Sequence, residues 1–143
     1  PVDDLKHFDA TLVPVGQYLD NYLTYNYPDE GIDHLECVLT SHLHTITNES
    51  RFYIVDGKVI TGSYYRVNDK LHNKLITPDE EVFKIAQQYV DIFNPCQAYV
   101  MDLALVGNTQ AVVEFNSINC AGLYACDYPK LLKALDNRGP AWN

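Results

Sequence analysis

The stretch AYVMDLALVGNTQAVVEFN, residues 98–116, decides the fold. Its two apolar runs, 98–106 and 110–116, are typical of β-strands, and the polar residues between them are typical of a tight turn. Glu114 and Asn116 are two residues apart, which is the side-chain repeat of a strand, so both project from one face. We therefore predict an antiparallel hairpin that carries a carboxylate and a carboxamide on the same face.

A further carboxylate, Asp102, lies in the first strand of this hairpin. A two-residue turn at 107–108 places Asp102 on the opposite face from Glu114, whereas a three-residue loop at 107–109 pairs the two directly. Asp102, Glu114 and Asn116 then gather on one face. Carboxylate and amide oxygens are the ligands that Mg²⁺ prefers, so a magnesium site requires the second register. We predict that register and the three-residue loop.

A second hairpin is predicted at Asp56-Gly57, between strands at 51–55 and 58–66. Both central positions of a type I′ turn need positive φ, which Asp-Gly supplies. This turn pairs Val55 with Lys58 and, by regular counting, Arg51 with Gly62.

On this register Arg51 shares a face with Arg66 if the second strand extends that far. Two interpretations remain open at this point. The two arginines are ordinary solvated charges, or they are a pair of guanidinium groups that bind phosphate or carboxylate.

Helical spacing of apolar residues predicts three helices. One covers 16–27. The next follows Thr77-Pro78-Asp79-Glu80, a helix start with capping-box chemistry, and ends at Asn94-Pro95. The last begins after Asp127. Strand-like runs at 11–15 and 35–46 precede the hairpins, so the fold class is α+β with a mainly antiparallel sheet and packed helices.

The composition limits the class of protein. The 143 residues are 47% hydrophobic, enough for a folded core, and carry a net charge of −9, which argues against a nucleic-acid surface. No apolar run approaches the roughly 20 residues that span a bilayer. The four cysteines lack a zinc spacing, and we expect reduced cytoplasmic thiols. His42 and His44 alternate along a strand and are an alternative metal pair without an apparent third ligand.

Taken in order, Arg51, the Asp56-Gly57 hairpin, Asp102 and Glu114-Phe115-Asn116 resemble the C-terminal half of ATP-grasp ligases. The resemblance is nearest to a clade that is common in phages and bacteria and related to the ribosomal-protein glutamate ligases. It implies an α+β fold, the ATP-grasp C-terminal lobe.

The resemblance covers residues 36–135, and 1–15 more loosely. We expect one domain over 1–143 that is a fragment of a larger protein. Residues 1–34 then end the N-terminal ATP-grasp lobe and 35–143 form the C-terminal lobe. The rest of the N-terminal lobe is expected to precede Pro1.

The resemblance also implies residue roles. Arg51 contacts nucleotide phosphate, and Asp102, Glu114 and Asn116 bind Mg²⁺. Arg66 contacts phosphate or the acyl substrate, so Arg51 and Arg66 are the candidate catalytic residues.

Three more residues are implied to contact ATP. Lys6 lies in a Lys-x-Phe pattern, residues 6–8, where the family has an ATP-binding lysine. Ser41 and His42 lie where the family has its adenine hinge.

The implied function is an ATP- and Mg²⁺-dependent carboxylate–amine ligase that acts through an acyl phosphate. The carboxylate and amine substrates are not defined by the sequence, and no nucleic-acid or membrane partner is expected. The isolated chain is expected to be weakly active or inactive. The alternative is a non-catalytic nucleotide-binding or protein-interaction module that retains the ATP-grasp fold.

Overall fold

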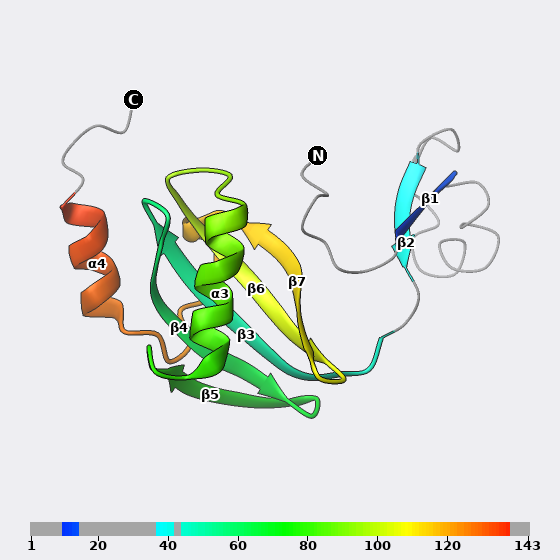
Figure 1. Cartoon of the computed structure of the whole chain (residues 1–143), viewed down its shortest axis with the longest axis horizontal. Coiled ribbons are helices and arrows are strands. Elements are labelled where there is room, and N and C mark those ends of the chain that lie inside the picture. Colours follow the sequence, from blue (N-terminus) through cyan, green and yellow to red (C-terminus); the bar gives the residue numbers. More distant parts are fainter. Residues whose placement is uncertain (1–9, 15–36, 42–43, 138–143) are drawn as a thin grey trace, which may run out of the picture. The chain divides into compact units, whose positions relative to one another are not determined.

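The structure is a computed structural model that describes residues 10–14, 37–41 and 44–137 (Figure 1). These residues belong to two compact units. The smaller contains β1 (Ala10–Pro14) and β2 (Cys37–Ser41), which pair antiparallel. Lys6, His42 and the predicted helix at 16–27 lie outside the described residues. The predicted division of the chain between 34 and 35 stays a prediction.

The larger unit is built on a five-stranded antiparallel sheet with the order β5-β4-β3-β6-β7. A 3₁₀ turn, η1 (Ile118–Cys120), follows the last strand, and two helices pack on the sheet. This arrangement confirms the predicted α+β class. The strands are β3 (Ile46–Val55), β4 (Lys58–Val67), β5 (Lys70–Ile76), β6 (Ala98–Val106) and β7 (Thr109–Asn116), and the helices are α3 (Glu81–Ile92) and α4 (Tyr128–Asp136).

Two-residue turns connect the first three strands of the sheet. Asp56 and Gly57 have φ values of 50° and 72°, which confirms the predicted turn. Asn68 and Asp69 have φ values of 46° and 60° and lead into β5, a strand that the sequence did not predict. β5 is exposed along nearly its whole length and lacks the apolar alternation of the other strands.

The register of the first hairpin differs from the prediction. Val55 pairs with Lys58 as expected, but Arg51 pairs with Ser63 and not with Gly62. A β-bulge between these two pairs inserts one extra residue into β4. The shift brings Gly62 opposite the fully buried ring of Phe52, where a side chain larger than hydrogen does not fit.

The second hairpin reaches its predicted pairing by a different route. Val106 pairs with Thr109, so the turn has two residues and the predicted three-residue loop is wrong. A bulge then follows at Val113, and Asp102 lies opposite Glu114 as predicted. The extra residue that we placed in the loop is instead inside the strand.

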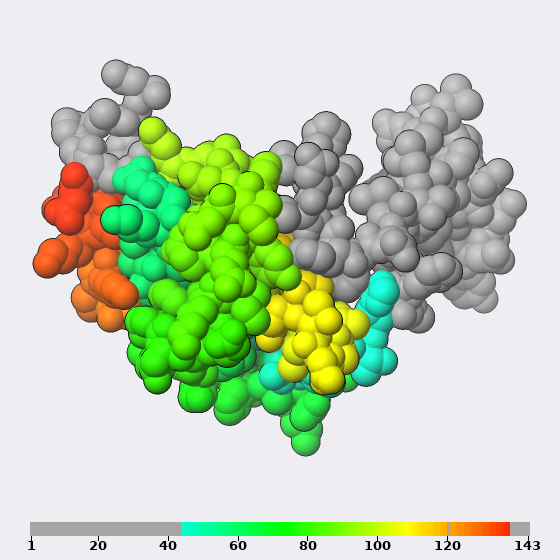
Figure 2. Space-filling model, in the orientation of Figure 1, coloured from blue at the N-terminus to red at the C-terminus, as the bar shows by residue number. Residues whose placement is uncertain are grey.

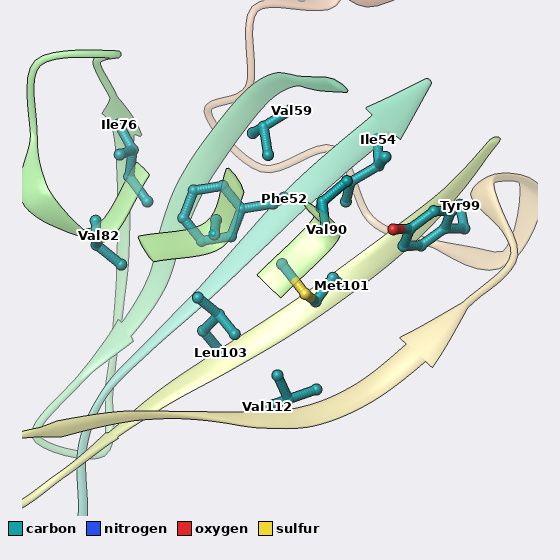
Figure 3. Close-up of a cluster of buried hydrophobic side chains, with 11 residues drawn as sticks. Phe52, Ile54, Val59, Ile76, Val82, Val90, Tyr99, Met101, Leu103 and Val112 are labelled. Carbon is teal, nitrogen blue, oxygen red and sulfur yellow. The ribbon is translucent and has the colours of Figure 1, made fainter. Parts of the chain in front are cut away.

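Both faces of the sheet are covered, by different helices. Helix α3 crosses one face (Figure 2), with its buried residues Val82, Ala86 and Val90 at helical spacing. On the other face, Leu131 of α4 packs against Tyr53. The cluster under α3 (Figure 3) contains Phe52, Ile54, Val59, Ile76, Val82, Ala86, Val90, Tyr99, Met101, Leu103 and Val112.

The helix starts follow the predicted chemistry, with one shift. The Glu80 carboxylate accepts a hydrogen bond from the Thr77 backbone N–H at 2.9 Å, but helix α3 begins only at Glu81, four residues after the predicted cap. Asp127 caps α4 as predicted by accepting from the Lys130 N–H at 3.0 Å. Neither described helix is long and apolar enough to cross a membrane.

The contact between Gly62 and Phe52 gives a stability prediction. A Cβ added at Gly62 lies 2.5 Å from a ring carbon of Phe52, so we expect Gly62→Ala to destabilise the protein by about 1–3 kcal/mol. Urea denaturation measures this loss. Phe52→Leu combined with Gly62→Ala should cost less than the sum of the single changes, and strict additivity would contradict the contact.

Candidate functional site

The candidate site is organised by an ion pair between the two central strands. Arg51 of β3 lies directly opposite Asp102 of β6. Its Nε donates to Oδ1 at 2.8 Å and its Nη2 donates to Oδ2 at 2.7 Å, the parallel arrangement that a guanidinium favours. The side chains are 11% and 2% exposed, so the pair is nearly excluded from water. The hydrogen bonding to Asp102 raises the pKa of Arg51, which keeps its charge fixed.

Two tyrosine rings contact the guanidinium. The Arg51 Cζ atom lies 5.6 Å from the ring centroid of Tyr65 and 5.4 Å from that of Tyr124, within cation–π range of both. The two rings also stack on each other, with centroids 5.0 Å apart and planes at 14°. Arg51 is therefore fixed on one side by a carboxylate and on another by aromatic rings.

A second bulge in β4 brings more side chains to this face. It lies between Ser50 and Glu49 of β3 and adds Tyr65 to the opposite strand, so that Tyr65 and Arg66 both reach the face of Arg51. Arg66 pairs with Glu49 at 3.3 Å, and the Tyr65 hydroxyl donates to Glu49 at 3.2 Å. Arg66 thus shares the face with Arg51 as predicted, but it is half exposed and already has a carboxylate partner.

Glu114 and Asn116 continue the site on β7. Both are exposed, and the Asn116 side-chain amide donates to Glu114 Oε1 at 2.7 Å. Only the NH₂ group of the amide can donate, so this contact leaves the Asn116 carbonyl oxygen free to act as an acceptor. Phe115 points to the other face and packs edge-on against Phe93.

The donor set of Asp102, Glu114 and Asn116 fits Mg²⁺ in its chemistry, because all three offer oxygen. It is not a ready-made cage. Both Asp102 oxygens already accept from Arg51, and among the described residues no group of three His, Cys, Asp or Glu side chains is arranged for a metal. A cation on this face would share Asp102 with a guanidinium.

Three buried hydroxyl groups attach the segment 121–127, which leads into α4, to this face of the sheet. They come from Tyr53, Thr61 and Ser63. Burial raises the pKa of Tyr53 to about 12, so its hydroxyl remains a donor through the neutral range. The contacts are Tyr53 OH to the carbonyl oxygens of Ala121 at 3.2 Å and Gly122 at 3.1 Å, Ala125 N–H to Ser63 at 3.1 Å, and Asp127 N–H to Thr61 at 2.8 Å.

The structure does not place every predicted site residue. Lys6 and His42 lie outside the described residues. Ser41 is the last residue of β2, and its side chain is also outside what the structure describes. His44 is exposed, and its pairing with His42 as an alternative metal site stays a prediction.

Sequence analysis missed three members of the site, Glu49, Tyr65 and Tyr124. The bulge that turns Tyr65 toward Arg51 leaves no pattern in the sequence. Tyr124 lies far along the chain from Arg51, in a segment expected to be a plain loop. A usable signal was the sequence Tyr64-Tyr65-Arg66, in which one of two adjacent tyrosines must face each side of a strand.

A comparison with protein families identifies the fold. Residues 10–135 match a family described as an ATP-grasp domain, family 3 of its clade. The chain belongs to this ATP-grasp family. No curated protein sequence matches it significantly.

Solved structures of the ATP-grasp ligase PsnB are similar to this ATP-grasp chain. The complex with a minimal precursor has a TM-score of 0.49 and 12% identity, and the match covers 79% of this chain and 47% of that chain. The complex with precursor peptide PsnA2 and AMPPNP has a TM-score of 0.49 and 14% identity, covering 79% and 45%. The chain therefore spans less than half of the length of these ligases.

The buried ion pair of this ATP-grasp domain gives a stability prediction. Removing one member leaves the other charged and buried, so we expect Arg51→Met and Asp102→Leu each to cost about 3–5 kcal/mol. The double variant should cost much less than the sum, since no unpaired charge remains. Urea denaturation of the four proteins measures this, and additive losses would contradict a coupled pair.

Tyr53 gives a prediction about alkaline pH. Its folded pKa of about 12 is above its usual value of 10.0, so its contribution to stability is complete below pH 10 and is lost between pH 10 and 12. Tyr53→Phe should lose about 1 kcal/mol at pH 7 from its hydrogen bonds. Its stability should then fall less steeply than that of wild type above pH 10, as followed by denaturation at several pH values. Parallel curves would be inconsistent with this assignment.

Proposed function

We propose that this chain supplies the C-terminal half of the active site of an ATP- and Mg²⁺-dependent carboxylate–amine ligase, with the nucleotide phosphates on the face of Arg51. The observation that carries the proposal is the cross-strand row Arg51, Asp102, Glu114, which combines a fixed cation with oxygen ligands on one sheet face. Membership of the ATP-grasp family supports it.

Arg51 is suited to bind phosphate. A guanidinium has five N–H donors, and Asp102 takes two of them. The other three make no hydrogen bond within the described part of the chain and are free for phosphate oxygens. Because Asp102 and the tyrosine rings fix the guanidinium, binding phosphate costs little side-chain entropy.

Glu114 and Asn116 are suited to hold Mg²⁺. Asn116 turns its carbonyl oxygen away from the hydrogen bond with Glu114, and Glu114 keeps its Oε2 outside that bond. Bound Mg²⁺ would neutralise charge on the β- and γ-phosphates. Arg51 repels a bare cation near Asp102, so phosphate and Mg²⁺ are expected to bind together, each offsetting the charge of the other.

The proposed reaction has two steps. An oxygen of the substrate carboxylate attacks the γ-phosphorus, the bond to ADP breaks, and an acyl phosphate forms. The amine then attacks the acyl carbon, phosphate leaves with the electron pair of the C–O bond, and the amine loses a proton. Arg51 stabilises the charge on the transferred phosphoryl group, and Arg66 holds phosphate or the acyl substrate.

The remaining contacts belong to the other half of such a site. Lys6 would contact phosphate, and Ser41 and His42 would contact the adenine. The N-terminal lobe of the ligase would close the site over the nucleotide. The chain alone is therefore expected to bind Mg-nucleotide weakly and to turn over little.

Calorimetric titration of Mg-AMPPNP tests the proposal. We expect wild type to bind, and Glu114→Gln to bind about 10- to 100-fold more weakly, because a charge-assisted contact is worth about 1.5–3 kcal/mol. Glu81→Gln is the matched control, since Glu81 is an exposed carboxylate on α3. Equal heats from wild type and Glu114→Gln would overturn the site assignment. No binding by wild type would favour the interaction-module alternative.

A further inference from the structure

We propose that Tyr124 is a positioning residue whose ring holds the Arg51 guanidinium in the orientation that meets phosphate. The inference rests on the proposed function for the role of Arg51. It assigns a task to the segment 121–127, which neither the family nor the ion pair explains.

The backbone of Tyr124 is held in an unfavourable conformation. Its φ is 50°, in the left-handed region that Cβ-bearing residues other than Asn and Asp rarely adopt. A bulky aromatic residue there is strained, and such strain persists only where surrounding contacts enforce it. Strained residues of this kind cluster at ligand-binding sites.

The enforcing contacts lie on both sides of Tyr124 in the chain. The Tyr53 hydroxyl holds the carbonyl of Gly122, and the Ser63 hydroxyl accepts from the N–H of Ala125. Both hydroxyls come from buried positions in the sheet. The sheet therefore fixes the backbone immediately before and after Tyr124 and directs its ring.

Burial does not explain the placement of the ring. Tyr124 remains 42% exposed, so it contributes little to the core. Its contacts are instead the stacked ring of Tyr65 and the guanidinium of Arg51. Asp102 fixes one edge of that guanidinium, and the rings restrict its rotation about the ion pair.

Replacing Tyr124 by Asn separates positioning from folding. Asn lacks the ring and tolerates left-handed φ, so Tyr124→Asn should keep or raise the melting temperature. The same variant should bind Mg-AMPPNP about 5- to 30-fold more weakly, as expected for a partly desolvated cation–π contact. Tyr124→Phe keeps the ring and should restore affinity. Tyr128→Asn, at an exposed tyrosine of α4, is the control and should match wild type.

A second measurement keeps the inference independent of nucleotide binding. The ¹⁵N relaxation of the Arg51 Nε–H group, recorded without nucleotide, should show a rigid side chain in wild type and Tyr124→Phe. It should show a mobile one in Tyr124→Asn. If wild type binds no Mg-nucleotide, the proposed function fails and this measurement alone decides the inference. Unchanged Nε–H order in Tyr124→Asn would overturn the inference, whether or not nucleotide binds.

Discussion

The ion pair between Arg51 and Asp102 is the interaction on which the site depends. It joins the two central strands and is buried, so each charge is tolerable only because the other is present. The pair also fixes the electrostatics of the whole face. It leaves Arg51 with free donors for an anion, and it leaves Glu114 and Asn116 as the exposed oxygen ligands beside it. A site for an anion and a cation together follows from this arrangement.

The strands carry bulges at the positions that bring side chains to this face. One in β4 aligns Arg51 with Ser63, the next adds Tyr65 beside Arg66, and one in β7 aligns Glu114 with Asp102. A regular ladder would alternate these residues between the two faces. Bulges are common next to active sites for this reason, because each one redirects a side chain without ending the strand. The opposite face keeps its apolar cluster under α3.

The parts of the fold that follow local rules were predictable from the sequence. The Asp56-Gly57 turn follows from backbone chemistry, and the apolar stripe of α3 follows from helical spacing. The pairing of Asp102 with Glu114 was predicted by way of a loop length that proved wrong, since the extra residue is Val113. Bulges arise from packing between strands, such as the ring of Phe52 over Gly62, and have no local signature. Tyr124 contradicts its own conformational preference, so only contacts distant in sequence could place it.

The account treats the sheet face as half of an active site, with the phosphates between Arg51 and the ligands on β7. A crystal structure of the protein with Mg²⁺ and AMPPNP tests this most directly. The account predicts phosphate oxygens within hydrogen-bond distance of Arg51 and a metal ion coordinated by Glu114 and Asn116. Nucleotide bound elsewhere, with this face empty and the ion pair of Arg51 and Asp102 unchanged, would contradict it.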